Sequence, residues 1–70
     1  MQLGRFDIGT CLYNKIPSPG VRVGMIDAQL NWVGMRLDDK TTITDFGDWI
    51  QVLCPKGVFW VQTSRWVAIE

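Results

Sequence analysis

The seventy-residue sequence contains no histidine, and this absence removes the side chain that most often serves as a general base or metal ligand. It has no net charge, because seven lysines and arginines balance seven aspartates and glutamates. Its apolar runs stay short of the roughly 18 residues that a membrane span needs. The first ten residues lack the apolar core of a signal peptide. We therefore expect a cytoplasmic protein that is neither secreted nor membrane-bound.

Few residues that could perform chemistry are present. The sequence has no Ser-His-Asp set, no glycine-rich phosphate loop and no cluster of metal ligands. Asp38 and Asp39 are adjacent, and neighbouring residues on a strand point to opposite faces. Cys11 and Cys54 lack an obvious activating partner, and we expect both to be reduced thiols, with Cys54 in the core. We predict no enzyme activity, no catalytic residue, no metal and no cofactor.

The basic residues are scattered along the chain rather than gathered in one run. Binding to nucleic acid depends on cationic groups that neutralise phosphates, and this requires a local basic patch. The neutral balance favours a protein partner, and the sequence carries no signal specific for DNA. RNA remains an alternative partner if basic side chains gather beside an aromatic ring.

Apolar residues recur at every second position, and this period is typical of half-buried strands. The alternation predicts that Val33, Met35 and Leu37 face the core while Gly34, Arg36 and Asp38 face outward. It likewise predicts an inward face for Val21, Val23 and Met25, and another for Ile50, Val52 and Cys54. Some of the predicted strand segments are fused, so that five or six short strands result; the segments are 10–16, 21–29, 31–38, 42–45, 49–54, 58–62 and 66–69.

Turn signals separate these segments about every 8–12 residues, which is the spacing of an all-β barrel or sandwich. The residues from Ile16 to Gly20 predict a rigid turn, and those from Asp38 to Lys40 predict a polar one. Pro55 to Gly57 predicts a tight hairpin, and Thr63 to Arg65 a short turn. Seventy residues are few for a sandwich, so we predict one all-β domain, residues 1–70, that forms a small open barrel of antiparallel strands.

The second half of the chain resembles SH3-like barrels, including bacterial SH3-like domains. The resemblance lies in Gly47-Asp48-Trp49-Ile50-Gln51-Val52, then Gly57, Trp60-Val61 and Ser64-Arg65-Trp66-Val67-Ala68-Ile69. It implies a strand with an early tryptophan, a hairpin, a second strand, one 3₁₀ turn and a last short strand. Phe59 stands where those domains place a glycine. The first half lacks the acidic loop and paired aromatics with which eukaryotic SH3 domains grip proline-rich peptides.

The segment from Gly24 to Asn31 resembles the glycine, aspartate and asparagine series of Sm-like proteins, although the spacing differs and the Ile-Arg-Gly signature is absent. The whole chain is similar to small phage-encoded barrels of this kind, which would place it in the host cytoplasm. Sm-like proteins are SH3-like barrels that pair edge strands into rings, so the resemblance implies self-association. No RNA-binding residue carries over, because the motif positions do not match.

Four tryptophans in seventy residues are an unusual surplus. Because side chains alternate between the two faces of a strand, Trp32, Trp49 and Trp66 are expected on the face opposite the predicted core residues of their strands. The same alternation does not decide the face of Trp60. Exposed indoles on a small domain mark interfaces. Three alternatives follow: indoles that cover the barrel ends, an interface between copies of the chain, or a platform for RNA bases, sugars or peptide prolines.

We predict a non-catalytic module that self-associates into a homo-oligomer, such as an Sm-like ring. An RNA or single-stranded nucleic-acid binder and a peptide- or cell-wall-binding module are the alternatives. The candidate interface or binding residues are Trp32, Trp49, Trp60, Trp66, Arg36 and Arg65.

Overall fold

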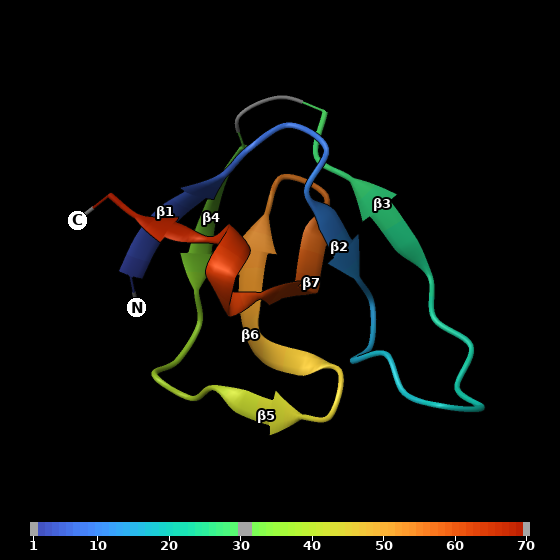
Figure 1. Ribbon diagram of the computed structural model, residues 1–70. Coiled ribbons are helices and arrows are strands. Elements are labelled where there is room, and N and C mark those ends of the chain that lie inside the picture. Colours follow the sequence, from blue (N-terminus) through green and yellow to red (C-terminus); the bar gives the residue numbers. More distant parts are fainter. Residues whose placement is uncertain (1, 30–31, 70) are drawn as a thin grey trace.

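A computed structural model describes residues 2–29 and 32–69 of the chain (Figure 1). Within these residues it contains eight β-strands and one turn of 3₁₀ helix. The elements are β1 (Gln2–Phe6), β2 (Cys11–Tyr13), β3 (Met25–Asp27), β4 (Trp32–Arg36), β5 (Thr42–Thr44), β6 (Gly47–Cys54), β7 (Gly57–Gln62), η1 (Thr63–Arg65) and β8 (Val67–Ala68). The predicted all-β class is confirmed, and the described residues form more strands than the five or six predicted.

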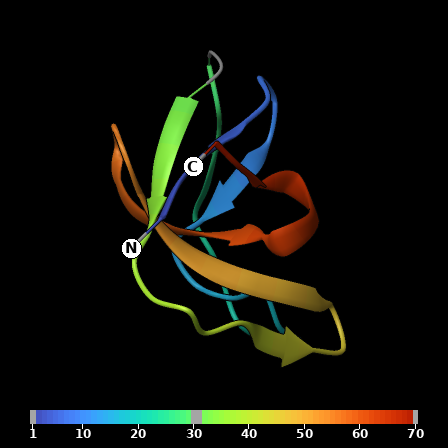
Figure 2. The same ribbon diagram turned by 90° about the vertical axis from the view of Figure 1, so that its left-hand side faces the viewer.

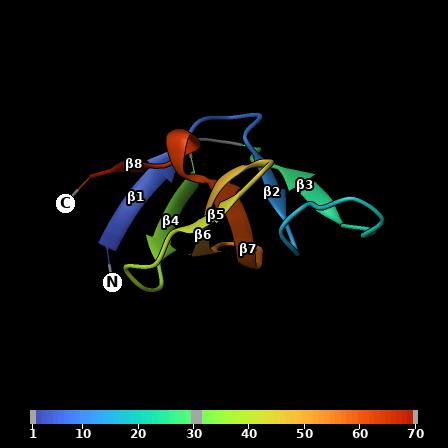
Figure 3. The same ribbon diagram turned by 60° about the horizontal axis from the view of Figure 1, so that its bottom comes forward.

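All strand pairs are antiparallel, and the strands follow the order β3-β2-β7-β6-β4-β1-β8. Figure 3 shows most of this order side by side, with β8 and β3 at the two ends. Because β7 pairs with β6 from Trp49 to Cys54, β5 and β4 share the other edge of β6. The side view shows β4 and the start of β6 running in very different directions (Figure 2). The sheet is therefore strongly twisted, and one of its faces can enclose a core.

The core is assembled from the inward positions of β1, β2, β6 and β7 together with Ala28 and Trp66. Ile50, Val52 and Cys54 are buried as the alternation predicted. Phe6 and Leu12 are almost completely buried as well. Phe6 belongs to β1, a strand that sequence analysis missed, because Gln2 to Phe6 contains a glycine and an arginine among few apolar residues.

The predicted faces of β4 are wrong. Gly34 is buried, and Val33 is 47% exposed. A Cβ atom at Gly34 would lie 2.7 Å from a ring carbon of Phe6. The ring of Phe6 therefore fills the space in which a side chain at position 34 would stand. The two faces of β4 are therefore exchanged relative to the prediction. Gly34 faces the core, and its neighbours Val33 and Met35 must face outward.

A second glycine explains the position of Trp66, which was predicted to project outward and is instead only 8% exposed. Its indole lies directly over Gly4, where any Cβ atom would overlap the ring. The indole Nε1 donates a hydrogen bond to the carbonyl of Gly34 at 3.4 Å. Val67 and Ile69, the residues predicted to face the core, are exposed.

The segment from 21 to 29 also departs from its prediction, because only Met25–Asp27 forms a strand. Val21 and Met25 are exposed, and Val23 is half-buried. Ile26, from the opposite face, packs against the core. Asn31, which begins the predicted strand 31–38 and ends the Gly24–Asn31 segment, lies outside the described residues.

The predicted turns from residue 38 onward are confirmed. Asp38 accepts a hydrogen bond from the backbone amide of Lys40 at 2.9 Å, in the manner of a turn-forming aspartate. Pro55 and Lys56 join β6 to β7, and Gly57 has a φ of +127°, which favours glycine. After Gly47 the chain follows the element order that the resemblance implied, including the 3₁₀ turn at Thr63–Arg65.

Candidate interaction surface

An apolar row crosses four neighbouring strands on the face of the sheet opposite the core. Leu3 pairs with Met35, Met35 with Leu53, and Leu53 with Val58. Directly paired residues of antiparallel strands point to the same face, so these four side chains lie next to one another. The row exists because the inward positions beside it are taken by glycines and by the buried Val52 and Cys54.

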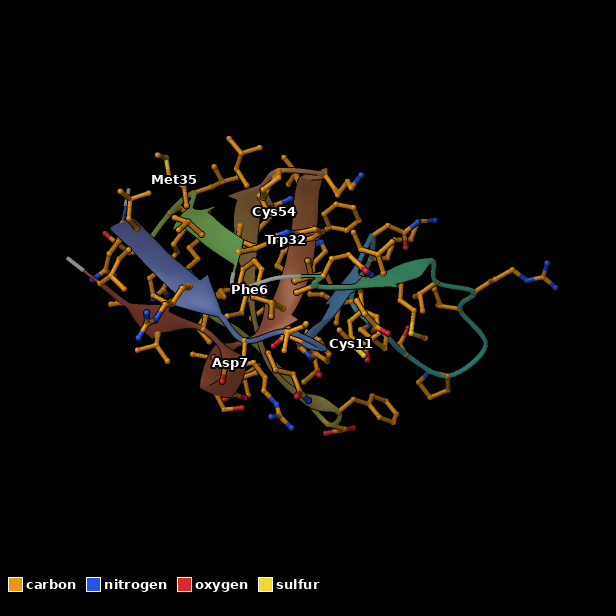
Figure 4. The ribbon with its side chains drawn as sticks, turned by 90° about the horizontal axis from the view of Figure 1, so that it is seen from above. Phe6, Asp7, Cys11, Trp32, Met35 and Cys54 are labelled. Atoms are coloured by element: carbon orange, nitrogen blue, oxygen red, sulfur yellow. The ribbon has the colours of Figure 1, made fainter. Side chains whose placement is uncertain are left out.

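Three further observations extend the row into a surface. Leu53 is 44% exposed and Val58 46% exposed. In Figure 4, Met35 points away from the interior that holds Phe6. Val33 precedes Met35 by two residues and Trp60 follows Val58 by two, so both share this face. We call this surface the outer apolar face; it consists of Leu3, Val33, Met35, Leu53, Val58 and Trp60.

Trp60 is the only candidate tryptophan that joins the outer apolar face. It is half-buried and pairs with Gln51 and Tyr13. Trp49 lies opposite Ile50 and Val52, as its parity predicted, and yet it is only 2% exposed. The expectation that it projects into solvent is wrong because other side chains cover it there. Tyr13 contacts its ring edge-on at 5.2 Å between centroids, and Thr44 Oγ1 accepts its Nε1 hydrogen bond at 3.3 Å.

Trp32 lies at a different place, where it helps to line a cavity of about 560 Å³. Together with Ile26 and Phe59 it is half-buried and packs against the core. The exposed residues around these three are Asp27, Gln29 and Lys56. We call this cavity the Trp32 pocket; its residues are Ile26, Asp27, Gln29, Trp32, Lys56 and Phe59.

Arg36 is half-buried and serves the fold locally. Its Nη2 donates to the carbonyl oxygens of Asp39 and Lys40 at 3.2 and 3.3 Å, and to Thr41 Oγ1 at 3.0 Å. Its Nε is buried without a hydrogen-bond partner. The guanidinium therefore holds the connection between β4 and β5 and was wrongly predicted to face outward.

Arg65 is exposed and helps to line a more polar cavity of about 370 Å³, together with Asp7, Cys11, Tyr13 and Gln62. The thiol of Cys11 donates a hydrogen bond to Asp27 Oδ1 at 3.3 Å. That bond, partial burial and the negative charge of Asp27 raise the pKa of Cys11. Burial is the main cause of a raised pKa at Tyr13. A raised thiol pKa is the opposite of the activation that a nucleophilic cysteine needs.

The six candidate residues do not form one site. Trp60 lies on the outer apolar face, Trp32 and Arg65 line separate cavities, and Trp49, Trp66 and Arg36 support the fold. Sequence analysis missed Leu53 and Val58 as surface residues. The sequence did contain a sign of them, because the segments 49–54 and 58–62 carry apolar residues on both faces. Only one face of each strand can pack against the core of a small sheet, so the apolar residues of the other face lie at the surface.

Within residues 2–29 and 32–69, no group of three or more acidic or cysteine side chains could hold a metal ion. Over the same residues, none of the helical structure has the length and apolar character to cross a bilayer. No protein-family model, curated protein or solved structure matches the chain.

Proposed function

We propose that this chain is a non-catalytic module that associates with a second copy of itself through the outer apolar face. The observation that carries the proposal is the continuous row Leu3–Met35–Leu53–Val58, which lies in register across four strands. Small soluble monomers rarely leave a contiguous apolar surface of this kind in water. Covering it removes apolar area from solvent, and this is the main driving force of protein association.

The charge of the chain supports a second copy as the occupant. The net charge is zero, so two copies approach without long-range repulsion. Arg5 pairs with Val33 and therefore points to the same side of the sheet, so it is a charged residue at the edge of the outer apolar face on β1. An apolar face is complementary to its own copy, so a two-fold arrangement buries the same row on both partners.

A face-to-face dimer differs from the ring that the Sm-like resemblance implies. Such a ring would pair the edge strands β3 and β8 of neighbouring copies. Both edges are short, with three residues in β3 and two in β8. The outer apolar face contains six apolar side chains, more than either edge strand has residues, and we therefore propose the closed dimer.

The resemblance to SH3-like barrels is part of the same proposal. Its support is the order of elements after Gly47: a strand, a tight hairpin, a second strand, a 3₁₀ turn and a short last strand. This barrel type hosts many unrelated activities, so the resemblance adds no catalytic role.

Light scattering after size-exclusion chromatography at micromolar concentration tests the proposal. We expect a mass about twice the 8.0 kDa of the monomer. Leu53→Lys places a charge in the middle of the row and should weaken the dimer by about tenfold or more. Ile43→Lys is the matched control, because Ile43 is 78% exposed on β5 and lies away from the face.

A monomer mass for the unmodified chain across this concentration range would refute the proposal. An equal loss of mass in Leu53→Lys and Ile43→Lys would refute the outer apolar face as the interface. A mass of five or more copies would favour the edge-paired ring.

A further inference from the structure

We propose that the Trp32 pocket binds one nucleobase, with the phosphate of the same nucleotide beside Lys56. This inference is independent of the proposed dimer, because the pocket and the outer apolar face have no residue in common.

The floor of the pocket suits a flat aromatic ligand. Trp32 and Phe59 present two half-buried rings, and Ile26 adds an aliphatic surface beside them. These side chains are already packed against the core, so they lose little freedom when a ligand arrives. Nucleobases stack on aromatic side chains through their π-faces, whatever the sequence. A cavity of about 560 Å³ also falls in the range of small-molecule sites.

The rim of the pocket suits the edge of a base better than it suits a hydrocarbon. Gln29 is held by a hydrogen bond from its Nε2 to the carbonyl of Asp27 at 3.2 Å, and its amide oxygen remains an acceptor. Base edges carry both donors and acceptors, and such a side chain can pair with them.

Lys56 supplies the positive charge. It is exposed at the tip of the β6–β7 hairpin, between Pro55, whose ring restricts φ, and Gly57, whose positive φ closes the turn. One lysine neutralises one phosphate, so a neutral chain can hold a single nucleotide without the broad basic patch that a long nucleic-acid tract requires.

Two-dimensional ¹H–¹⁵N spectra of the indole groups test the site directly. The Trp49 and Trp66 indole N–H groups are hydrogen-bonded in buried positions and should not shift, so they are internal references. Trp60 reports on the outer apolar face. We expect uridine and adenosine 5′-monophosphate to shift only the Trp32 signal, which Trp32→Phe identifies by its loss. The expected Kd is about 1 mM for one nucleotide.

Lys56→Gln and its control Lys40→Gln test the phosphate contact. Raising the salt from about 50 to about 200 mM should weaken binding of the mononucleotide about twofold, because salt screens the attraction between Lys56 and the phosphate. Lys56→Gln should remove this salt dependence. Lys40, which is exposed in the turn before β5, should retain it when changed to glutamine.

Three ligands complete the test. An octauridylate that binds at least tenfold more tightly than the mononucleotide identifies single-stranded RNA as the source of the base, and equal affinities identify a free nucleotide. Ribose 5-phosphate should leave Trp32 unshifted. The proposal is overturned if no nucleotide moves the Trp32 signal at several millimolar, if ribose 5-phosphate moves it equally, or if a proline-rich peptide alone moves it. Repeating the titration with Leu53→Lys separates this result from any effect of self-association.

Discussion

Cys11 and Asp27 lie opposite each other on paired strands, and this pairing determines the acidity of the thiol. The residues are register partners in β2 and β3, and Cys11 Sγ donates to Asp27 Oδ1 at 3.3 Å. Ionising the thiol would break that bond and place two negative charges side by side. The pKa of Cys11 is therefore raised, and the thiol stays protonated at neutral pH.

We expect Asp27→Asn to speed alkylation of Cys11 severalfold at about pH 8. The substitution removes the anion, so the pKa of Cys11 falls toward its ordinary value and the thiolate fraction rises. Rates of iodoacetamide reaction between about pH 7 and 10, measured with Cys54 replaced by serine, check this. Asp7→Asn is the control, because Asp7 lines the same cavity but does not hold the thiol. Equal acceleration in both variants would contradict the assignment.

Single residues also explain where prediction from sequence fails. Alternation correctly placed Ile50, Val52 and Cys54 in the core, because β6 runs through the centre of the sheet. It failed for β4 and for Trp66, since no local pattern shows that the ring of Phe6 fills the space at Gly34, or that Trp66 fills the space at Gly4. In the alternation, a glycine packed against a large ring is read as an outward position, like a polar residue. Only the ring that packs on it in the folded structure shows that it faces the core.

At the scale of elements, the β5–β6 connection depends on one hydroxyl group. Thr44 Oγ1 donates to the carbonyl of Gly47 at 2.9 Å and accepts from the amide of Phe46 at 3.1 Å. It also accepts the Nε1 hydrogen bond of Trp49. One side chain thus closes the turn and fixes the buried indole under β5.

We expect Thr44→Val to lower the free energy of unfolding by about 1–3 kcal/mol, because the shape is kept while three hydrogen bonds are lost. Chemical denaturation followed by tryptophan fluorescence measures the change. Thr42→Val is the matched control two residues earlier, where the side chain is exposed, and it should change the stability by less than about 0.5 kcal/mol. Similar losses in the two variants would show that the hydroxyl of Thr44 has no special role.

The order of the strands and turns was predicted better than the faces to which their side chains point. The tight turn at Pro55 and Lys56 and the short turn at Thr63–Arg65 were both predicted from local residues, and the 3₁₀ form of the second turn was implied by the resemblance to SH3-like barrels. β1 lacked such a signal, because its five residues become a strand through pairing with β4 and β8 rather than through their own propensity. The outer apolar face was missed for a related reason: it is a property of paired registers and of no single segment.

At the scale of the whole molecule, a domain of seventy residues buries a modest share of its surface, so a partner can contribute much of its stability. If the outer apolar face is covered by a second copy, folding and association are linked by mass action. The unfolding temperature then depends on protein concentration.

We expect the unfolding midpoint to rise by about 5 °C for a roughly 100-fold increase in protein concentration. Calorimetry or circular dichroism at several concentrations measures this rise. Leu53→Lys should remove the dependence, whereas Ile43→Lys should retain it. A midpoint that is independent of concentration in the unmodified chain would show that the dimer does not form near the transition.

The row Leu3–Met35–Leu53–Val58 joins residues from the two ends of the chain, and this has a consequence for biosynthesis. The surface does not exist until β7 has been made and β1 has paired with β4, so a partly synthesised domain cannot display it. If two copies associate through this face, as proposed above, they can do so only after each domain has folded.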